Sequence, residues 1–136
     1  MQNTKGEVVF YGVDDINSKL ENILKDLNLK EQSFETKLIL SEAINNAFIH
    51  GNKGDKEKSI YVQWNLSKEI LTLTVTDCGE GIAGEDIFRE VDEDNLLEES
   101  GRGLYIIRSY TDEVIIEGNS IIMKKTFNRI KRDNKV

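Results

Sequence analysis

Two hydrophobic spacings alternate along the chain, and the switches between them divide it into predicted strands and helices. Apolar residues alternate with polar ones over residues 60–66 and 70–77, which is typical of strands with one buried face. Residues 7–13 predict a further strand. Apolar positions three or four apart predict helices over residues 14–27, 33–50 and 103–110. The apolar runs 114–116 and 121–123 predict a closing hairpin.

The first two predicted helices carry boundary signals. Asp14 or Asp15 is expected to cap the first turn of the first helix. In the second helix the expected core stripe is Phe34, Leu38, Ile44, Ala47 and Phe48. Residues 51–55 (GNKGD) tolerate left-handed backbone, so they are expected to end this helix.

The predicted element order is β-α-α-β-β-loop-α-β-β, which favours an α+β fold. We expect a two-layer α/β sandwich, with a mainly antiparallel mixed sheet and helices on one face. The 136 residues are expected to form a single domain, 1–136. Residues 83–100 predict an acidic mobile loop, and residues 128–136 a flexible basic tail.

Composition narrows the function. The formal net charge of −7 argues against general nucleic-acid binding. No apolar run is long enough for a membrane span, and the N-terminus lacks a signal pattern, so we expect no membrane association. The single cysteine, Cys78, excludes an internal disulfide and favours the cytoplasm. We interpret Cys78 as a small buried residue.

Three short segments carry candidate chemistry. Glu42 and Asn46 are four residues apart in SEAINNAFIHGN, so they share a helix face. The amide oxygen of Asn46 is a suitable Mg²⁺ ligand, and the carboxylate of Glu42 could orient or deprotonate an attacking hydroxyl. In TVTDCGEGI, Asp77 ends a strand and can accept a hydrogen bond from an exocyclic amine, while Gly79 and Gly81 allow close approach. Each segment alone is a weak signal, compatible with exposed surface or an ordinary turn.

The third segment opens the last predicted helix with Ser100-Gly101-Arg102-Gly103-Leu104. Glycines before a helix leave N–H groups free to face an anion, and the helix dipole favours negative charge there. Arg102 could add a charge-assisted contact to a phosphate. The segment is equally compatible with a glycine hinge at a helix start.

Together and in this order, the three segments resemble the N, G1 and G2 boxes of the GHKL (Bergerat-fold) ATPases over about residues 31–127. Within that family, SEAINNAFIHG, TDCGEGI and GRGLYIIRSYTDEV look most like the anti-sigma factor serine/threonine kinases. The resemblance implies Mg²⁺ and ATP (or ADP) as cofactors. It implies Glu42 as general base, Asn46 as Mg²⁺ ligand and Asp77 as adenine contact.

The resemblance also implies a pocket and a lid. Residues 83–100 would be the ATP lid, and Arg102 could assist transfer. The further expected nucleotide-binding residues are Gly79, Gly81, Ile82, Ser100, Gly101, Arg102, Gly103, Leu104 and Ser120. His50, at the end of the N box, is interpreted as a packing or hydrogen-bonding residue rather than a phosphate acceptor.

The implied partners are a sigma factor and a small anti-sigma antagonist of the STAS type, whose serine would be phosphorylated. A homodimer using the sheet edge near the first strand is also implied. Some kinases of this group have Arg where this chain has Glu99, which favours an alternative function, an ATP-dependent binding switch with little kinase activity. The motifs are also compatible with a stand-alone catalytic domain of the histidine-kinase type and with a non-enzymatic interaction module.

Overall fold

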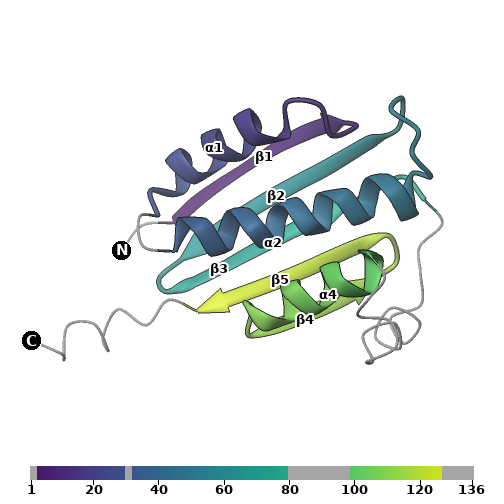
Figure 1. Ribbon diagram of the computed structural model, residues 1–136. Helices are drawn as coiled ribbons and strands as arrows, with labels where there is room; N and C mark the ends of the chain where they lie inside the picture. Colours follow the sequence, from purple (N-terminus) through teal and green to yellow (C-terminus); the bar gives the residue numbers. More distant parts are fainter. Residues whose placement is uncertain (1–2, 30–31, 80–98, 127–136) are drawn as a thin grey trace, which may run out of the picture.

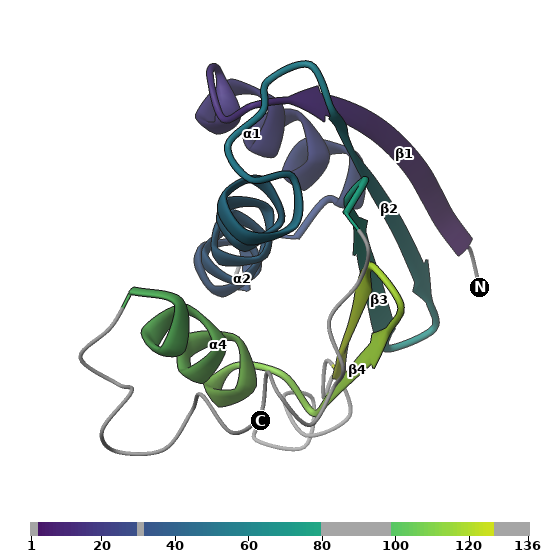
Figure 2. The same ribbon diagram turned by 90° about the vertical axis from the view of Figure 1, so that its right-hand side faces the viewer.

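The chain folds into two layers, a curved sheet with helices on one face (Figures 1 and 2). The structure is a computed structural model that describes residues 3–29, 32–79 and 99–126. The predicted α+β two-layer sandwich is confirmed. The elements in chain order are β1 (Asn3–Tyr11), α1 (Ile16–Leu27), α2 (Ser33–Asn46), the π-helical turn η1 (Ala47–Gly51), β2 (Ser59–Ser67), β3 (Ile70–Thr76), α4 (Glu99–Ser109), β4 (Glu113–Glu117) and β5 (Ser120–Thr126).

The sheet has the strand order β1-β2-β3-β5-β4, and all four pairings between the described strands are antiparallel. Val62 on β2 lies opposite Val75 on β3, which in turn lies opposite Ile121 on β5. Because side chains alternate between faces, this register gathers the apolar positions of the central strands on the face that the helices cover. The central position of β3 places its C-terminal end, and hence Asp77, beneath the end of α2.

The core lies between the sheet and the three α-helices (Figure 2). It is built from the alternating residues of the strands and from one stripe of each helix. Its largest fully buried side chains are Phe10, Leu20, Ile39, Leu40, Ile44, Ile60, Leu71, Leu73, Ile107 and Met123. Burial of such side chains contributes roughly 1.5–3 kcal/mol each, so this layer fixes α2 and α4 on the sheet.

Two local predictions for the first third of the chain are wrong. The first strand begins at Asn3 rather than at residue 7, because its whole length pairs with β2. The predicted aspartate cap is absent: Asp15 has a left-handed backbone (φ 62°) and makes no side-chain capping hydrogen bond. Asp14 instead forms an exposed ion pair with Lys56 at 3.1 Å.

The predicted core stripe of the second helix is also partly wrong. Phe34 is 73% exposed, whereas the residues of α2 that are buried are Thr36, Ile39, Leu40, Ala43 and Ile44. This helix lies between α1 and α4, so it buries a broad face, and its apolar positions do not form one narrow stripe in the sequence. Phe34 lies in the first turn of this helix, where its neighbour Glu35 is paired with Lys125 of β5 at 2.8 Å.

The edge strand β1 packs through a glycine. A Cβ atom on Gly6 would overlap the indole ring of Trp64, whose Nε1–H donates a hydrogen bond to Asp26 of α1 at 2.8 Å. We expect Gly6→Ala to lower the free energy of unfolding by about 1–3 kcal/mol, because the ring must move in a packed layer. Urea unfolding measures this loss. Lys5→Ala, at an exposed neighbouring position, is the control, and equal midpoints for the two variants would contradict this packing.

Candidate functional site

The first contact of the candidate site joins α2 to the start of α4. A Cβ atom on Gly103 would lie 2.8 Å from Oε1 of Glu42, and 3.5 and 3.6 Å from Nδ2 and Oδ1 of Asn46. The two residues that share a helix face in the sequence therefore meet the second turn of α4 in space. This helix begins at Glu99 rather than at residue 103, so the prediction that Gly101 and Gly103 precede the helix is wrong. Because Gly103 has no side chain, the main chain of α4 approaches the carboxylate and the amide closely.

The second contact joins the end of α2 to the end of β3. After Asn46 the helix widens into the π-helical turn η1, where the Asn52 N–H donates to the Ala47 carbonyl at 2.8 Å. Such turns are rare and are frequent at functional sites. This turn sets Gly51 directly against the carboxylate of Asp77, so that a Cβ on Gly51 would overlap Oδ2.

Asp77 is held at both its side chain and its main chain. Its Oδ1 accepts a hydrogen bond from the Gly79 N–H at 2.7 Å. Its N–H donates to the Asn119 carbonyl at 3.0 Å, and the Asn119 side-chain amide donates to the Asp77 carbonyl. Partial burial raises the pKa of the Asp77 carboxyl above its usual value, and the Gly79 N–H partly opposes that rise. The carboxylate is thus a partly desolvated acceptor in a fixed position.

Asn52 connects three parts of this region. It is fully buried, and its Nδ2 donates to the carbonyls of Lys58 at 3.2 Å and Ser59 at 3.1 Å. Its Oδ1 accepts from the Cys78 N–H at 2.8 Å. The end of the helix, the start of β2 and the turn after β3 are therefore joined through one side-chain amide.

The other predicted site residues lie in α4, on β5 or outside the described residues. Ser100, Gly101 and Arg102 lie in the first turn of α4. The prediction that the lid extends to residue 100 is therefore wrong for Glu99 and Ser100, while Gly81, Ile82 and residues 83–98 lie outside the described residues. Leu104 is buried in the core. The Ser120 hydroxyl lies 2.7 Å from that of Thr76, its partner across the strands, while its neighbour Asn119 contacts Asp77.

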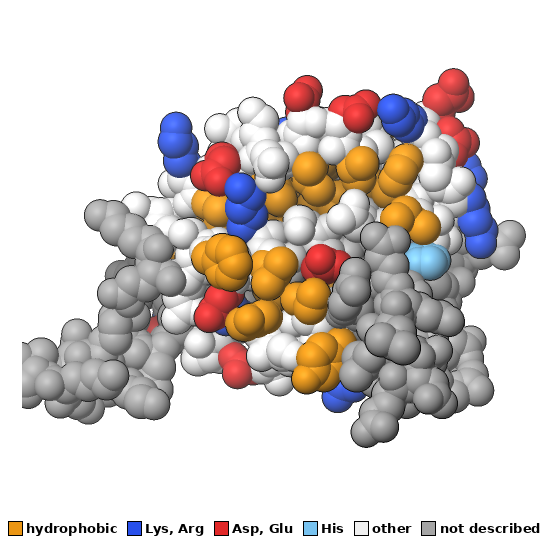
Figure 3. Space-filling view, in the orientation of Figure 1, with side chains coloured by type: hydrophobic (Ala, Val, Ile, Leu, Met, Phe, Trp, Pro, Cys, Tyr) orange, Lys and Arg blue, Asp and Glu red, His pale blue; other side chains and the backbone are white. Residues whose placement is uncertain are grey.

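Two side chains near the site, those of Cys78 and His50, are exposed to solvent. Cys78 is exposed, so its interpretation as a buried residue is wrong; its Sγ lies 3.3 Å from the Ser59 carbonyl. The single histidine, His50, lies on η1 and is exposed (pale blue in Figure 3).

The residues present fit a bound Mg-nucleotide. Asn46 offers an amide oxygen, Glu42 a carboxylate one turn away, and Asp77 an acceptor with which no described Lys or Arg forms an ion pair. Among the described residues no group of three or more His, Cys, Asp or Glu is placed to hold a metal ion.

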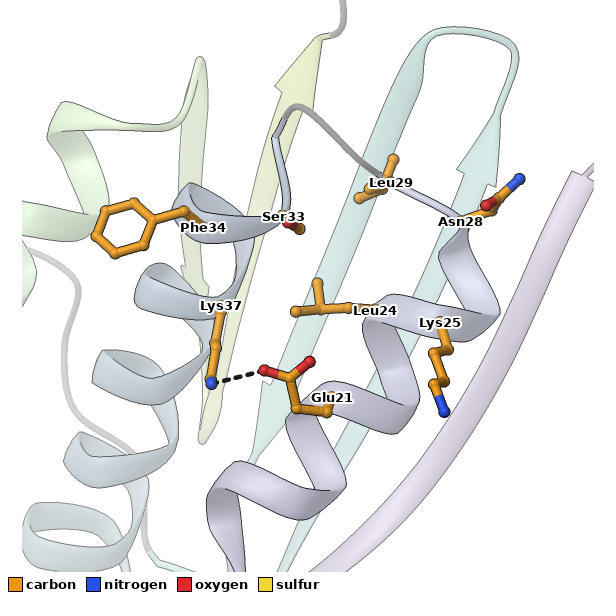
Figure 4. A pocket seen from close by; sticks show the side chains of 8 residues that line it. All are labelled: Glu21, Leu24, Lys25, Asn28, Leu29, Ser33, Phe34 and Lys37. Atoms are coloured by element: carbon orange, nitrogen blue, oxygen red, sulfur yellow. Dashed lines mark hydrogen bonds and ion pairs between the residues drawn. The ribbon is translucent and has the colours of Figure 1, made fainter.

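A separate hollow of about 500 Å³ lies at the other end of α2 (Figure 4). It is bordered by Phe34 and Leu24 and by the ion pair between Lys37 and Glu21 at 2.8 Å. None of the predicted site residues lines it. The geometry and chemistry at Glu42 and Asp77, rather than the size of this hollow, define the candidate site.

Comparison with known proteins decides the family. The profile of the histidine kinase-like ATPase domain matches residues 13–125, which include α2, the Asp77 turn and α4. The chain belongs to the histidine kinase-like ATPase family. The predicted resemblance to the GHKL ATPases is therefore confirmed, and an ATPase domain supports nucleotide binding by this chain.

Among similar proteins are several anti-sigma F factors. That of Geobacillus thermodenitrificans (strain NG80-2) is 35% identical over 104 residues, 71% of each chain. That of Geobacillus sp. (strain WCH70) is 32% identical over 107 residues, again 71% of each chain. That of Bacillus cytotoxicus is 37% identical over 94 residues, 65% of this chain and 62% of the relative. These relatives support the predicted place of the chain among anti-sigma factor kinases.

Sequence reasoning missed Gly51, Asn52 and Asn119 as members of the site. Gly51 and Asn52 lie at the end of SEAINNAFIHGN, where they predict only the end of the helix, and Asn119 lies in the turn of the predicted closing hairpin. The helix continues into η1 through Gly51, and Asn52 has φ −90°, so left-handed backbone does not explain its presence. Its buried amide is the reason for an asparagine at this position.

The contact at Gly103 predicts a selective defect. We expect Gly103→Ala to fold with a free energy of unfolding within about 1 kcal/mol of wild type, because Ala favours the helix and only the end of Glu42 must move. Stabilisation by Mg-ATP in a thermal unfolding experiment should fall, because the displaced carboxylate crowds Asn46. Ser109→Ala, at the far end of α4, is the control. Equal Mg-ATP stabilisation in both variants would contradict the contact.

The raised pKa of Asp77 predicts a pH-dependent stability. A raised folded-state pKa means that the contribution of Asp77 is most favourable below its unfolded value of 3.8 and is lost as pH rises through the folded value. Asn stays neutral and keeps an oxygen for the Gly79 N–H. We therefore expect ligand-free Asp77→Asn to gain stability relative to wild type as pH rises from 3 to 7. Urea unfolding at several pH values measures this, and the opposite slope would exclude burial as the main cause.

Proposed function

We propose that this chain binds Mg-ATP between α2, the Asp77 turn and the start of α4, and that it uses the nucleotide to act as an anti-sigma factor kinase. The contact of Gly103 with Glu42 and Asn46 carries the proposal, because it packs the helix that would hold Mg²⁺ against the second turn of the helix whose start would face phosphate. The family match and the anti-sigma F factors among the relatives support it.

Each described site residue has a role in this proposal. Asp77 accepts a hydrogen bond from the adenine amine, and Gly79 lets the turn approach the base. Asn46 provides the protein ligand to Mg²⁺. The N–H groups at the start of α4 face the phosphates, as expected for a helix N-terminus. The complete proposed set also includes Gly81, Ile82, Ser100, Gly101, Arg102, Leu104 and Ser120.

Glu42 is the proposed general base. Bound Mg-ATP supplies the phosphoryl group and neutralises its charge. Glu42 orients a serine hydroxyl of the substrate protein and accepts its proton, which requires the carboxylate to lie within hydrogen-bond reach of that hydroxyl. Arg102 contributes positive charge toward the transferred group. Residues 83–100 act as the lid that excludes water.

The proposed partners are a sigma factor, which the protein sequesters, and an antagonist of the STAS type, which it phosphorylates. The protein acts in the cytoplasm, and the net charge of −7 disfavours nucleic acid as a partner. Within the described residues no helix is long and apolar enough to cross a membrane. A homodimer through the edge strand β1 is part of the proposal, and the exposed Val9 and Tyr11 on that strand support it.

Nucleotide binding is tested first by thermal unfolding with and without Mg-ATP. At about 100 times its dissociation constant a ligand stabilises the folded state by roughly 2.7 kcal/mol, which shifts the transition by several degrees for a domain of this size. We expect this shift for wild type and a loss or Mg²⁺ independence in Asn46→Ala. No shift at millimolar Mg-ATP would remove the basis of the proposal.

Phosphoryl transfer is tested separately with labelled ATP and an antagonist protein. We expect acid-stable phosphoserine, and a fall of at least about 100-fold in transfer for Glu42→Gln with Mg-ATP binding retained. Acid-labile phosphate would indicate a histidine acceptor instead. Binding without transfer would favour the ATP-dependent switch, which Glu99 supports because it stands where some kinases of the group have Arg.

A further inference from the structure

The side chain of Asn52 is saturated by main-chain groups from two other segments. Its amide nitrogen donates to the carbonyls of Lys58 and Ser59, and its oxygen accepts from the Cys78 N–H. The residue is 0% exposed. Two carbonyl acceptors and one N–H donor also fix the orientation of the amide. In the reverse orientation its oxygen would face two carbonyl oxygens and its NH₂ group would face an N–H.

This donor and acceptor set accepts no ordinary replacement. Aspartate cannot donate to two carbonyls, serine has one hydroxyl hydrogen, and glutamine is one methylene longer in a position without free space. A purely apolar residue would remove all three bonds, and it would leave the Lys58 carbonyl and the Cys78 N–H without the partner that Asn52 provides. The requirement is therefore specific to asparagine, and the bonds that impose it end one residue from Asp77.

The bonds of Asn52 lie beside the contact that confines the Asp77 carboxylate. Gly51 presses on that carboxylate, and the Gly51 carbonyl lies against Gly79, so residues 51 and 52 face residues 77–79 as a continuous pair of short segments. Fixing the Cys78 N–H fixes the main chain immediately after Asp77. The direction of the carboxylate then depends on this anchor as well as on the bonds to Asn119.

We propose that Asn52 is a positioning residue for base recognition: by anchoring the main chain at Cys78 it aims the Asp77 carboxylate at the exocyclic amine of adenine. This inference rests on the proposed nucleotide site. Asn52 itself does not touch the nucleotide. Its loss should therefore reduce discrimination between bases, whereas a general loss of stability should not.

Inosine triphosphate is the probe for this role, because it has a carbonyl oxygen where ATP has the amine. Wild type should bind Mg-ATP at least about tenfold more tightly than Mg-ITP. The Asp77 carboxylate accepts a charge-assisted hydrogen bond from the amine of ATP, whereas it would face the carbonyl oxygen of ITP. In Asn52→Ala we expect Mg-ATP affinity to fall about tenfold while Mg-ITP affinity changes little. The preference should then fall to about threefold or less, as measured by titration calorimetry.

Thr36→Val is the matched control. Thr36 is also 0% exposed on α2, and its hydroxyl donates to the Gln32 carbonyl at 2.8 Å, but it lies at the opposite end of the helix from Asn46. This variant loses a buried hydrogen bond without touching residues 77–79. It should lose thermal stability and keep the wild-type ratio of Mg-ATP to Mg-ITP affinity.

The outcomes separate the inference from the function on which it rests. A wild-type protein that binds neither nucleotide would overturn the proposed function, and with it the role of Asn52. A wild-type ratio retained in Asn52→Ala would overturn the role of Asn52 alone, and would assign the positioning of Asp77 to Asn119.

Two further measurements apply where Asn52→Ala does not fold. Asn52→Ser keeps a shorter side chain whose hydroxyl oxygen can accept from the Cys78 N–H, and it should show an intermediate nucleotide preference; an undiminished preference would overturn the inference. Hydrogen exchange of the wild type reports on the anchor directly. The Cys78 N–H should exchange as slowly as the amides of the central strands, and exchange at the rate of an exposed amide would overturn the anchor.

Discussion

The candidate site depends on the contact between the end of α2 and the end of β3, where Gly51 meets the Asp77 carboxylate. Any larger residue at position 51 would displace that carboxylate. The contact is possible because η1 widens the last turn of the helix, and because α2 is fixed on the sheet by buried residues such as Ile39 and Ile44. The same helix then presents Glu42 and Asn46 to the start of α4, so one rigid element positions both halves of the site.

Partial burial of Asp77 has an energetic consequence that favours ligand binding. The carboxylate loses water without gaining an ion pair from the described cations, and burial raises its pKa. Among the described residues, the Gly79 N–H donates a hydrogen bond that partly compensates this loss. A ligand that donates a hydrogen bond to Asp77 replaces the lost hydration, whereas in the ligand-free protein the loss remains. Incomplete solvation of this kind is typical of binding sites, which often lower the stability of the ligand-free protein.

Periodicity predicted the element types and the order of the described elements, because a spacing of two and a spacing near 3.6 are direct consequences of backbone geometry. It did not predict the exposure of Phe34 or Cys78, since both depend on which neighbours cover a position. The expected cap at Asp15 fails because the chain enters α1 in a left-handed conformation. Helical spacing predicts that Glu42 and Asn46 share a face, whereas their grouping with Asp77 follows from the family resemblance. Asn52 was missed because its partners are main-chain groups, one of them 26 residues away, and a residue's type does not reveal such partners.

Calorimetric titration of the wild type and of Asp77→Asn with Mg-ATP tests the central claim most directly. The variant keeps the hydrogen bond from Gly79 and is expected to remain folded, so a change in binding reports on the carboxylate alone. The account predicts saturable binding at one site per chain for the wild type and a loss of at least about tenfold in affinity for the variant. Equal affinity in the two proteins, or no binding by the wild type, would contradict an ATP site built on Asp77.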